Sequence, residues 1–126
     1  MKGKSILALT VCCVLLPAAH AADNSRTMRG WFVDEACTRD RVEAGRIEPS
    51  NPECAKRCVK EGSKLMFLSE TDKALFALKD SAGQEANIGF YVEVVGSTNE
   101  QALTVSSVKR LAELNAMCER PKSKKK

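Results

Sequence analysis

Residues 27–33 read TMRGWFV, and this stretch decides the fold class. Aromatic and β-branched residues dominate it, as is typical of a strand, and its single glycine, Gly30, predicts a bulge or a sharp bend. Asp34 and Glu35 end the run. We therefore expect the fold to begin with a β-strand that bends at Gly30.

Short apolar runs separated by turn residues continue this pattern toward the C-terminus. The turns are rich in Ser, Asp, Asn and Gly, which tolerate turn geometry. Four further strands are predicted at residues 65–68, 74–78, 90–95 and 103–108. Residues 107–117 have a second interpretation, a short C-terminal helix capped by Ser107.

One helix is predicted after the first strand. Asn51 is a capping residue, Pro52 suits the first helical position, and Gly62 marks the stop. Its apolar positions recur on one face and are Cys54, Ala55, Cys58 and Val59. Residues 37–50 show no sustained period, so we expect an irregular crossover there with one helical turn near residues 39–44.

Five strands and one inserted helix predict a mainly β domain over residues 22–118. The commonest five-stranded solution of this size is an OB-like barrel or antiparallel sheet, and a sandwich is the alternative.

The N-terminus has the three parts of a bacterial export signal. Lys2 and Lys4 precede an apolar run at residues 6–16, and an A-x-A box at residues 19–21 predicts cleavage between Ala21 and Ala22. The apolar run of eleven residues is too short for a bilayer span, which needs roughly 20. The sequence thus predicts a periplasmic or secreted protein with a signal peptide at residues 1–21 and no membrane span.

Charge is concentrated at the C-terminus. The formal net charge is +4, but residues 119–126 alone carry a surplus of four positive charges, and residues 22–118 have a net charge of about −2. The tail contains no aromatic residue, which predicts a disordered basic tail. A slightly acidic body does not favour nucleic-acid binding.

Four cysteines remain once Cys12 and Cys13 leave with the signal. They are Cys37, Cys54, Cys58 and Cys118. In an oxidising compartment they predict two disulfides. Because Cys54 and Cys58 lie one helical turn apart, the demanding disulfide geometry favours pairing each with a cysteine elsewhere. Either Cys37–Cys54 with Cys58–Cys118 or Cys37–Cys58 with Cys54–Cys118 satisfies this, and both stay open.

The alternative is a thiol-redox site or a zinc or copper(I) site. Its candidate ligands are Cys37, Cys54 and Cys58, joined by Cys118 or Asp34. The sequence lacks the C-x-x-C spacing typical of both. Asp34 has the simpler interpretation of a cap or turn acceptor at the end of the first strand.

No catalytic set is visible, and we predict neither an enzyme nor a cofactor. The only histidine, His20, leaves with the signal, which excludes a His-based triad. Trp31 and Tyr91 are candidate stacking residues, and core packing is their alternative. The outward-facing candidates are Lys56, Arg57 and Lys60. The expected partner is an unidentified protein or envelope component, with a nucleic-acid or polyanion-binding module as an alternative.

Two motifs carry a resemblance. Residues 30–37 read GWFVDEAC and residues 54–62 read CAKRCVKEG. Together they resemble the pattern G-W-x-x-D-x-x-C … C-x3-C-V-K-x-G of a family of small exported bacterial domains of unknown function. The resemblance covers residues 27–108 and implies a non-catalytic OB-like barrel.

The chain departs from this family pattern next to the first cysteine. Many members have a glycine there and often a nearby histidine, whereas Thr38 follows Cys37 and the mature chain has no histidine. This departure argues against carrying a metal site over from the family.

Overall fold

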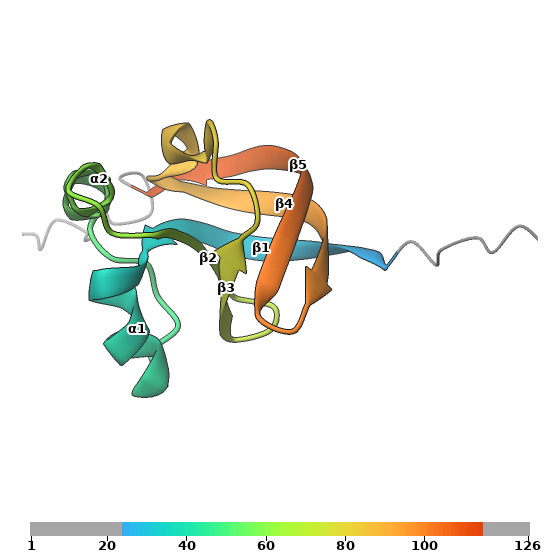
Figure 1. The fold of residues 1–126 in the computed structure, drawn as a ribbon, viewed down its shortest axis with the longest axis horizontal. Helices are drawn as coiled ribbons and strands as arrows, with labels where there is room; N and C mark the ends of the chain where they lie inside the picture. Colours follow the sequence, from blue (N-terminus) through green and yellow to red (C-terminus); the bar gives the residue numbers. More distant parts are fainter. Residues whose placement is uncertain (1–23, 115–126) are drawn as a thin grey trace, which may run out of the picture.

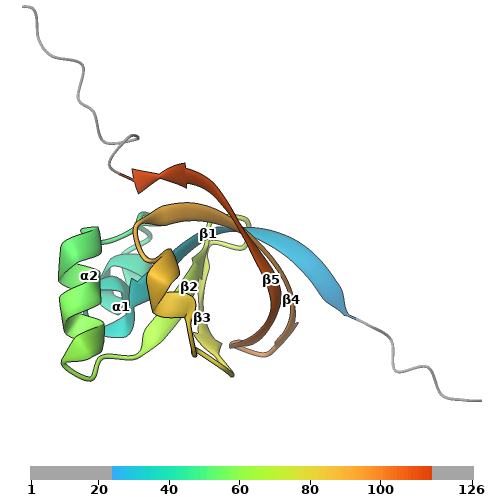
Figure 2. The ribbon, with the colours of Figure 1, turned by 90° about the horizontal axis from the view of Figure 1, so that it is seen from above.

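Five strands of the described part of the chain close into a ring. The computed structural model describes residues 24–114. The strands are β1 Ser25–Asp34, β2 Leu65–Ser69, β3 Ala74–Leu78, β4 Phe90–Asn99 and β5 Ala102–Glu113. Their order around the ring is β1-β2-β3-β5-β4, with β4 returning to β1 (Figures 1 and 2). All five predicted strands are therefore confirmed.

β1 reaches both neighbours by changing partner halfway along its length. Its first half pairs with β4 and its second half with β2, and Gly30 is opposite both Val92 and Ser69. An added Cβ at Gly30 would lie 1.8 Å from the carbonyl oxygen of Leu68. The glycine predicted to mark a bend thus lies where β1 passes from one neighbour to the other, at a point without room for a side chain.

The ring closes through a short parallel contact. Ala77 and Leu78 of β3 are opposite Ala102 and Leu103 of β5, whereas the other strand pairs are antiparallel. The expected purely antiparallel sheet is therefore wrong at this seam. Only two residue pairs form the seam, so the ring is not a regular barrel.

Two helices follow β1 in the described chain, where one was predicted: α1 Glu35–Glu43 and α2 Pro52–Lys60. Both lie on one side of the ring, beside the end of β1 (Figures 1 and 2). The predicted helix is confirmed as α2, because the Asn51 side chain accepts hydrogen bonds from the backbone N–H groups of Glu53 and Cys54. A 3-10 turn, η1 Gln84–Asn87, precedes β4. The domain is mixed α/β rather than mainly β.

α1 replaces most of the expected irregular crossover. Its only buried residue is Thr38, so it lacks the apolar period by which a helix is recognised. The Asp34 carboxylate caps it, and Glu35 adds a negative charge in its first turn. This helix is specified by its N-terminus rather than by an apolar face.

β5 continues through most of the segment for which a C-terminal helix was the alternative. Val108 is opposite Val94 and Ala112 is opposite Tyr91, so that helix is wrong as far as Glu113. Val108 and Ala112 are four residues apart, a spacing that suits one face of a strand or of a helix, and the pattern alone is ambiguous. The rest of that segment, the tail, and the predicted signal peptide lie outside the described residues.

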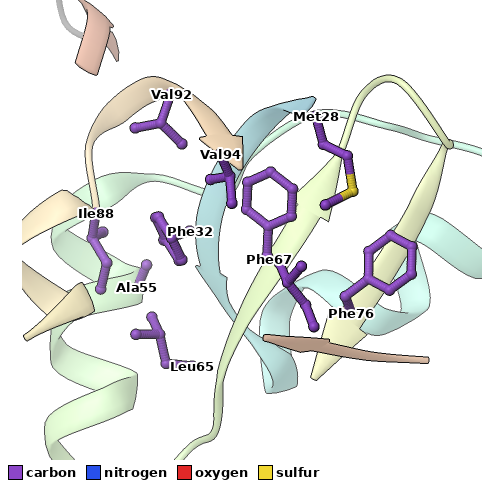
Figure 3. Packing of buried hydrophobic residues seen from close by; sticks show 10 residues of the cluster. Met28, Phe32, Ala55, Leu65, Phe67, Phe76, Ile88, Val92 and Val94 are labelled. Atoms are coloured by element: carbon purple, nitrogen blue, oxygen red, sulfur yellow. The ribbon is translucent and has the colours of Figure 1, made fainter. Parts of the chain in front are cut away.

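The two faces of β1 and β2 are both buried. Inside the ring, Phe32 packs on Phe67 with ring centroids 5.4 Å apart, and Figure 3 shows Ala55 of α2 and Ile88 at one end of this cluster and Met28 and Phe76 at the other. A second cluster covers the opposite face and consists of Trp31, Val33, Met66, Leu68 and Leu114, with Val42 of α1 against it. Because α1 and α2 cover β1 and β2, their positions are fixed relative to the end of β1.

Replacing Gly30 by alanine tests the crossing point in β1. We expect Gly30→Ala to lower the free energy of unfolding by about 1–3 kcal/mol, the usual cost of overpacking, because the added methyl group meets backbone. Urea denaturation followed by circular dichroism measures this. Thr27→Ala, at an exposed position of the same strand, is the control and should cost less than about 1 kcal/mol. Equal losses in the two variants would contradict this account of Gly30.

Candidate metal centre

Three side chains that can bind a metal meet where β1 ends. Asp34 is the last residue of β1, Cys37 lies in the first turn of α1, and Cys58 lies in the last turn of α2. One potential ligand atom from each lies within 4.8 Å of the other two. The two sulfur atoms are 3.9 Å apart. Cys37 and Cys58, which are 21 positions apart in the sequence, thus form a pair of thiols beside the Asp34 carboxylate.

Backbone contacts hold α2 against α1 at this point. The chain leaving α2 turns back, and its Lys64 carbonyl accepts a hydrogen bond of 2.9 Å from the N–H of Glu35. The Ser63 hydroxyl accepts a second one, 3.2 Å long, from the N–H of Ala36. Both donors belong to the first turn of α1. The last turn of α2, with Cys58, is therefore fixed beside Cys37.

Asp34 is fully buried and accepts two hydrogen bonds. Its Oδ2 caps α1 by accepting from the N–H of Cys37 at 2.9 Å, and its Oδ1 accepts from the Ser50 hydroxyl at 3.2 Å. The prediction that Asp34 is a cap is confirmed. No Lys or Arg within residues 24–114 forms an ion pair with it. The buried carboxylate therefore has hydrogen-bond donors but no cation, although two of its lone-pair positions remain.

The carboxylate and the second thiol change the acidity of Cys37. Hydrogen bonding of its thiol to Asp34 first and to Cys58 second raises the pKa of Cys37 to about 11, and the nearby Asp34 charge adds to this effect, because each of these interactions favours the neutral thiol. The thiol is exposed, yet it stays protonated at neutral pH and is a weak nucleophile. This property speaks against a fast thiol-exchange site.

Cys58 opens onto solvent through a groove between the start of α1 and the end of α2. The groove has a volume of about 580 Å³, and its wall includes both acidic and basic residues: Glu35, Asp40, Glu61, Arg39 and Lys64. The site is thus closed by Asp34 on the protein side and accessible to a small ion from the groove.

Cys54 stands apart from this group. It is on α2 one turn before Cys58, and its sulfur lies 4.0 Å from the Arg57 guanidinium. Within the described chain, the grouped ligands are Asp34, Cys37 and Cys58, so the predicted three-cysteine set is not assembled. Cys118 lies outside the described residues.

The candidate stacking residues lie in the outer cluster. Trp31 is only 7% exposed and contacts the half-buried Tyr91, with ring centroids 5.3 Å apart. The Tyr91 hydroxyl donates to Glu70. Core packing, the alternative for Trp31, is therefore what the structure shows, and Trp31 offers no open face to a base.

The three basic candidates lie on the exposed side of α2. Lys56, Arg57 and Lys60 are all exposed, as predicted, and Lys56 pairs with Glu53 at 3.4 Å. Exposed pairs of this kind contribute little to stability. These cations do not form one surface with buried Trp31.

Sequence reasoning missed the role of Ser50. The sequence placed it only at the end of the expected crossover over residues 37–50, but it is 7% exposed and donates to Asp34. Its position directly before the capping residue Asn51 carries no signal for a contact with a residue 16 positions earlier.

Within residues 24–114, every helix is too short or too polar to cross a membrane.

Removing the charge of Asp34 tests its effect on Cys37. Asn is as good a helix cap as Asp, so Asp34→Asn should keep α1 and lower the pKa of Cys37. In reduced, metal-free protein, Cys37 should then react faster with iodoacetamide at pH 8. The thiolate fraction at pH 8 rises about tenfold for each unit by which the pKa falls, whereas intrinsic nucleophilicity drops about threefold, so we expect a net gain of roughly threefold per unit. Mass spectrometry of the alkylated peptides measures the rate.

Cys54 in the same protein is the internal control, and its alkylation rate should not change. An unchanged or slower Cys37 would contradict the assigned cause of its raised pKa.

Comparison of the chain with protein-family models, with curated proteins and with solved structures found no match in any of the three. The resemblance to the family of small exported domains therefore stays a prediction.

Proposed function

We propose that the chain is an exported metal-binding domain in which Asp34, Cys37 and Cys58 bind one zinc ion. The observation that carries this proposal is the convergence of two thiols on a buried carboxylate that has no cationic partner in the described chain. A zinc ion would supply that cation.

The sulfur spacing fits a tetrahedral ion. Two thiolates bound to zinc at about 2.3 Å are about 3.8 Å apart when the angle is tetrahedral. The two sulfur atoms here are 3.9 Å apart. A bound carboxylate oxygen would lie about 3.6 Å from each sulfur. Its present separation is at most 4.8 Å, so a shift of about 1 Å at most completes the site.

The ligand chemistry favours zinc. Thiolates select zinc, copper(I) and iron–sulfur clusters, whereas calcium and magnesium need oxygen ligands. The carboxylate shifts the preference toward zinc, which accepts both sulfur and oxygen, and away from copper(I). Water from the groove would occupy the fourth position.

The electrostatics of the site also favour a bound divalent cation. The Asp34 charge disfavours a Cys37 thiolate in the metal-free site. A divalent cation reverses this effect, because it attracts the negative ligands and displaces the thiol protons.

The proposal that the domain is exported rests on the predicted signal peptide, and the proposal that it is OB-like rests on the strand topology. The ring order β1-β2-β3-β5-β4 supports an OB-like barrel, the common small five-stranded solution. The slightly acidic body and the buried Trp31 favour a metal over a nucleic acid as ligand.

A structural disulfide between Cys37 and Cys58 is the second candidate. The same closeness of the two sulfurs favours it, since oxidation would need them to approach from 3.9 Å to about 2.05 Å. Such a bond would tie α1 to α2 and make no use of the Asp34 charge.

Zinc titration of reduced, chelator-treated protein tests the metal site. We expect one zinc per chain, measured by calorimetry and by competition with a coloured chelator. Cys37→Ser and Cys58→Ser should each weaken binding by at least about tenfold, because each removes a thiolate ligand, and Asp34→Asn should also weaken it.

Cys54→Ser is the matched control, because Cys54 lies on the same helix one turn away from Cys58. It should bind zinc as the unmodified chain does. Equal weakening by Cys54→Ser, or no zinc binding by the reduced chain, would overturn the proposal. A chain purified with a Cys37–Cys58 disulfide that resists mild reduction would favour the second candidate.

A further inference from the structure

A small apolar groove lies between α2 and η1, which are neighbours on one side of the ring (Figure 2). Its volume is about 300 Å³, and its walls are almost entirely apolar. Ile88 and Val59 line the groove and also belong to or pack against the cluster inside the ring, and the exposed Ala86 completes the apolar lining. The cluster inside the ring is therefore reached from solvent along this groove.

Two lysines and one carboxylate border the groove. Lys56 and Lys60 are exposed and lie one turn apart on the same flank of α2. Lys56 pairs with Glu53, whereas Lys60 has no ion pair within residues 24–114. Glu85 borders the groove from η1 and has no ion pair in that range either. An anionic group beside Lys60 would thus meet an unpaired cation, with Glu85 as the opposing charge on the other wall.

This groove is separate from the candidate metal centre. Cys58 lines the groove toward α1, whereas Lys56 and Lys60 lie on the other flank of α2. The buried Ala55 lies between the two flanks. An inference about the second groove therefore goes beyond the proposed function and does not depend on zinc.

We propose that the groove between α2 and η1 binds one fatty-acid molecule, with the acyl chain against Val59, Ala86 and Ile88 and the carboxylate beside Lys60. The apolar walls offer few hydrogen-bond partners, so a peptide segment would leave backbone groups unpaired there, whereas an acyl chain has none. The volume is at the lower end of the range for small-molecule sites, which suits a single chain rather than a two-chain membrane lipid. Residues 119–126 of the same chain carry a surplus of four positive charges and do not complement Lys60.

Titration of the purified chain with decanoate, below the concentration at which it forms micelles, tests this site. We expect saturable binding of one decanoate per chain in calorimetry, with NMR shifts of backbone amides confined to residues 56–60 and 85–88. Affinity should rise roughly fourfold for each CH₂ group that is buried, and thus from hexanoate through octanoate to decanoate. Decylamine, which has the same chain length but a cationic head, should bind less tightly than decanoate.

Charge variants on the two walls have opposite expected effects. Lys60→Gln should weaken decanoate binding about twofold to fivefold, as for an exposed ion pair, and Glu85→Gln should strengthen it, because it removes a like charge. Ala86→Leu should weaken binding at least about tenfold, because the larger side chain takes the space of two or more CH₂ groups. Arg57→Gln is the matched control: it removes the same charge from the same helix, but Arg57 does not line the groove. It should bind decanoate as the unmodified chain does.

Several outcomes would overturn the proposal. They are a lack of saturable decanoate binding, equal weakening by Lys60→Gln and Arg57→Gln, and amide shifts that lie away from the groove. Binding to phosphatidylglycerol vesicles without binding of free decanoate would assign the surface to a membrane instead. Cys58→Ser should leave decanoate binding unchanged, so the zinc site and the acyl-chain site can fail independently.

Discussion

The buried carboxylate of Asp34 is the contact on which the helical side of the domain depends. Its two oxygens accept hydrogen bonds from the Cys37 N–H and the Ser50 hydroxyl. The first bond starts α1 directly after β1, and the second fixes the residue before the cap of α2. One side chain thus sets the start of one helix and the approach to the next. These contacts place Cys37 in the first turn of α1, where its sulfur lies beside that of Cys58.

The same carboxylate creates an electrostatic problem that the domain solves only in part. A buried charge is costly unless it is hydrogen-bonded or paired. The two donors and the positive N-terminal end of α1 provide partial compensation. Hydrogen bonding to this carboxylate and its negative charge both favour the neutral thiol of Cys37, whose pKa rises to about 11. A cation that binds Asp34 and both sulfurs would complete the compensation, and this links the helix cap to the proposed function.

Sequence reasoning predicted those elements whose signal is local. The strands were visible as short apolar runs, and α2 was visible from Asn51, Pro52 and its apolar face. α1 was predicted only as one helical turn near residues 39–44, because a capped surface helix has almost no apolar period. The parallel seam between β3 and β5 and the contact of Cys37 with Cys58 depend on tertiary closure, for which four cysteines give only a set of possible pairings. Asp34 was correctly predicted as a cap, but its place beside both thiols required the structure.

The position of each cysteine on α2 explains why Cys58, and not Cys54, belongs to the group with Asp34 and Cys37. Cys54 and Cys58 are separated by one turn, about 5.4 Å along the axis. The later turn is fixed against α1 by the bonds from Glu35 to Lys64 and from Ala36 to Ser63, so Cys58 faces Asp34. The earlier turn lies next to Gly89, where the described chain ends. These contacts at the last turn of α2 bring Cys58, rather than the cysteine one turn earlier, to within 3.9 Å of the Cys37 sulfur.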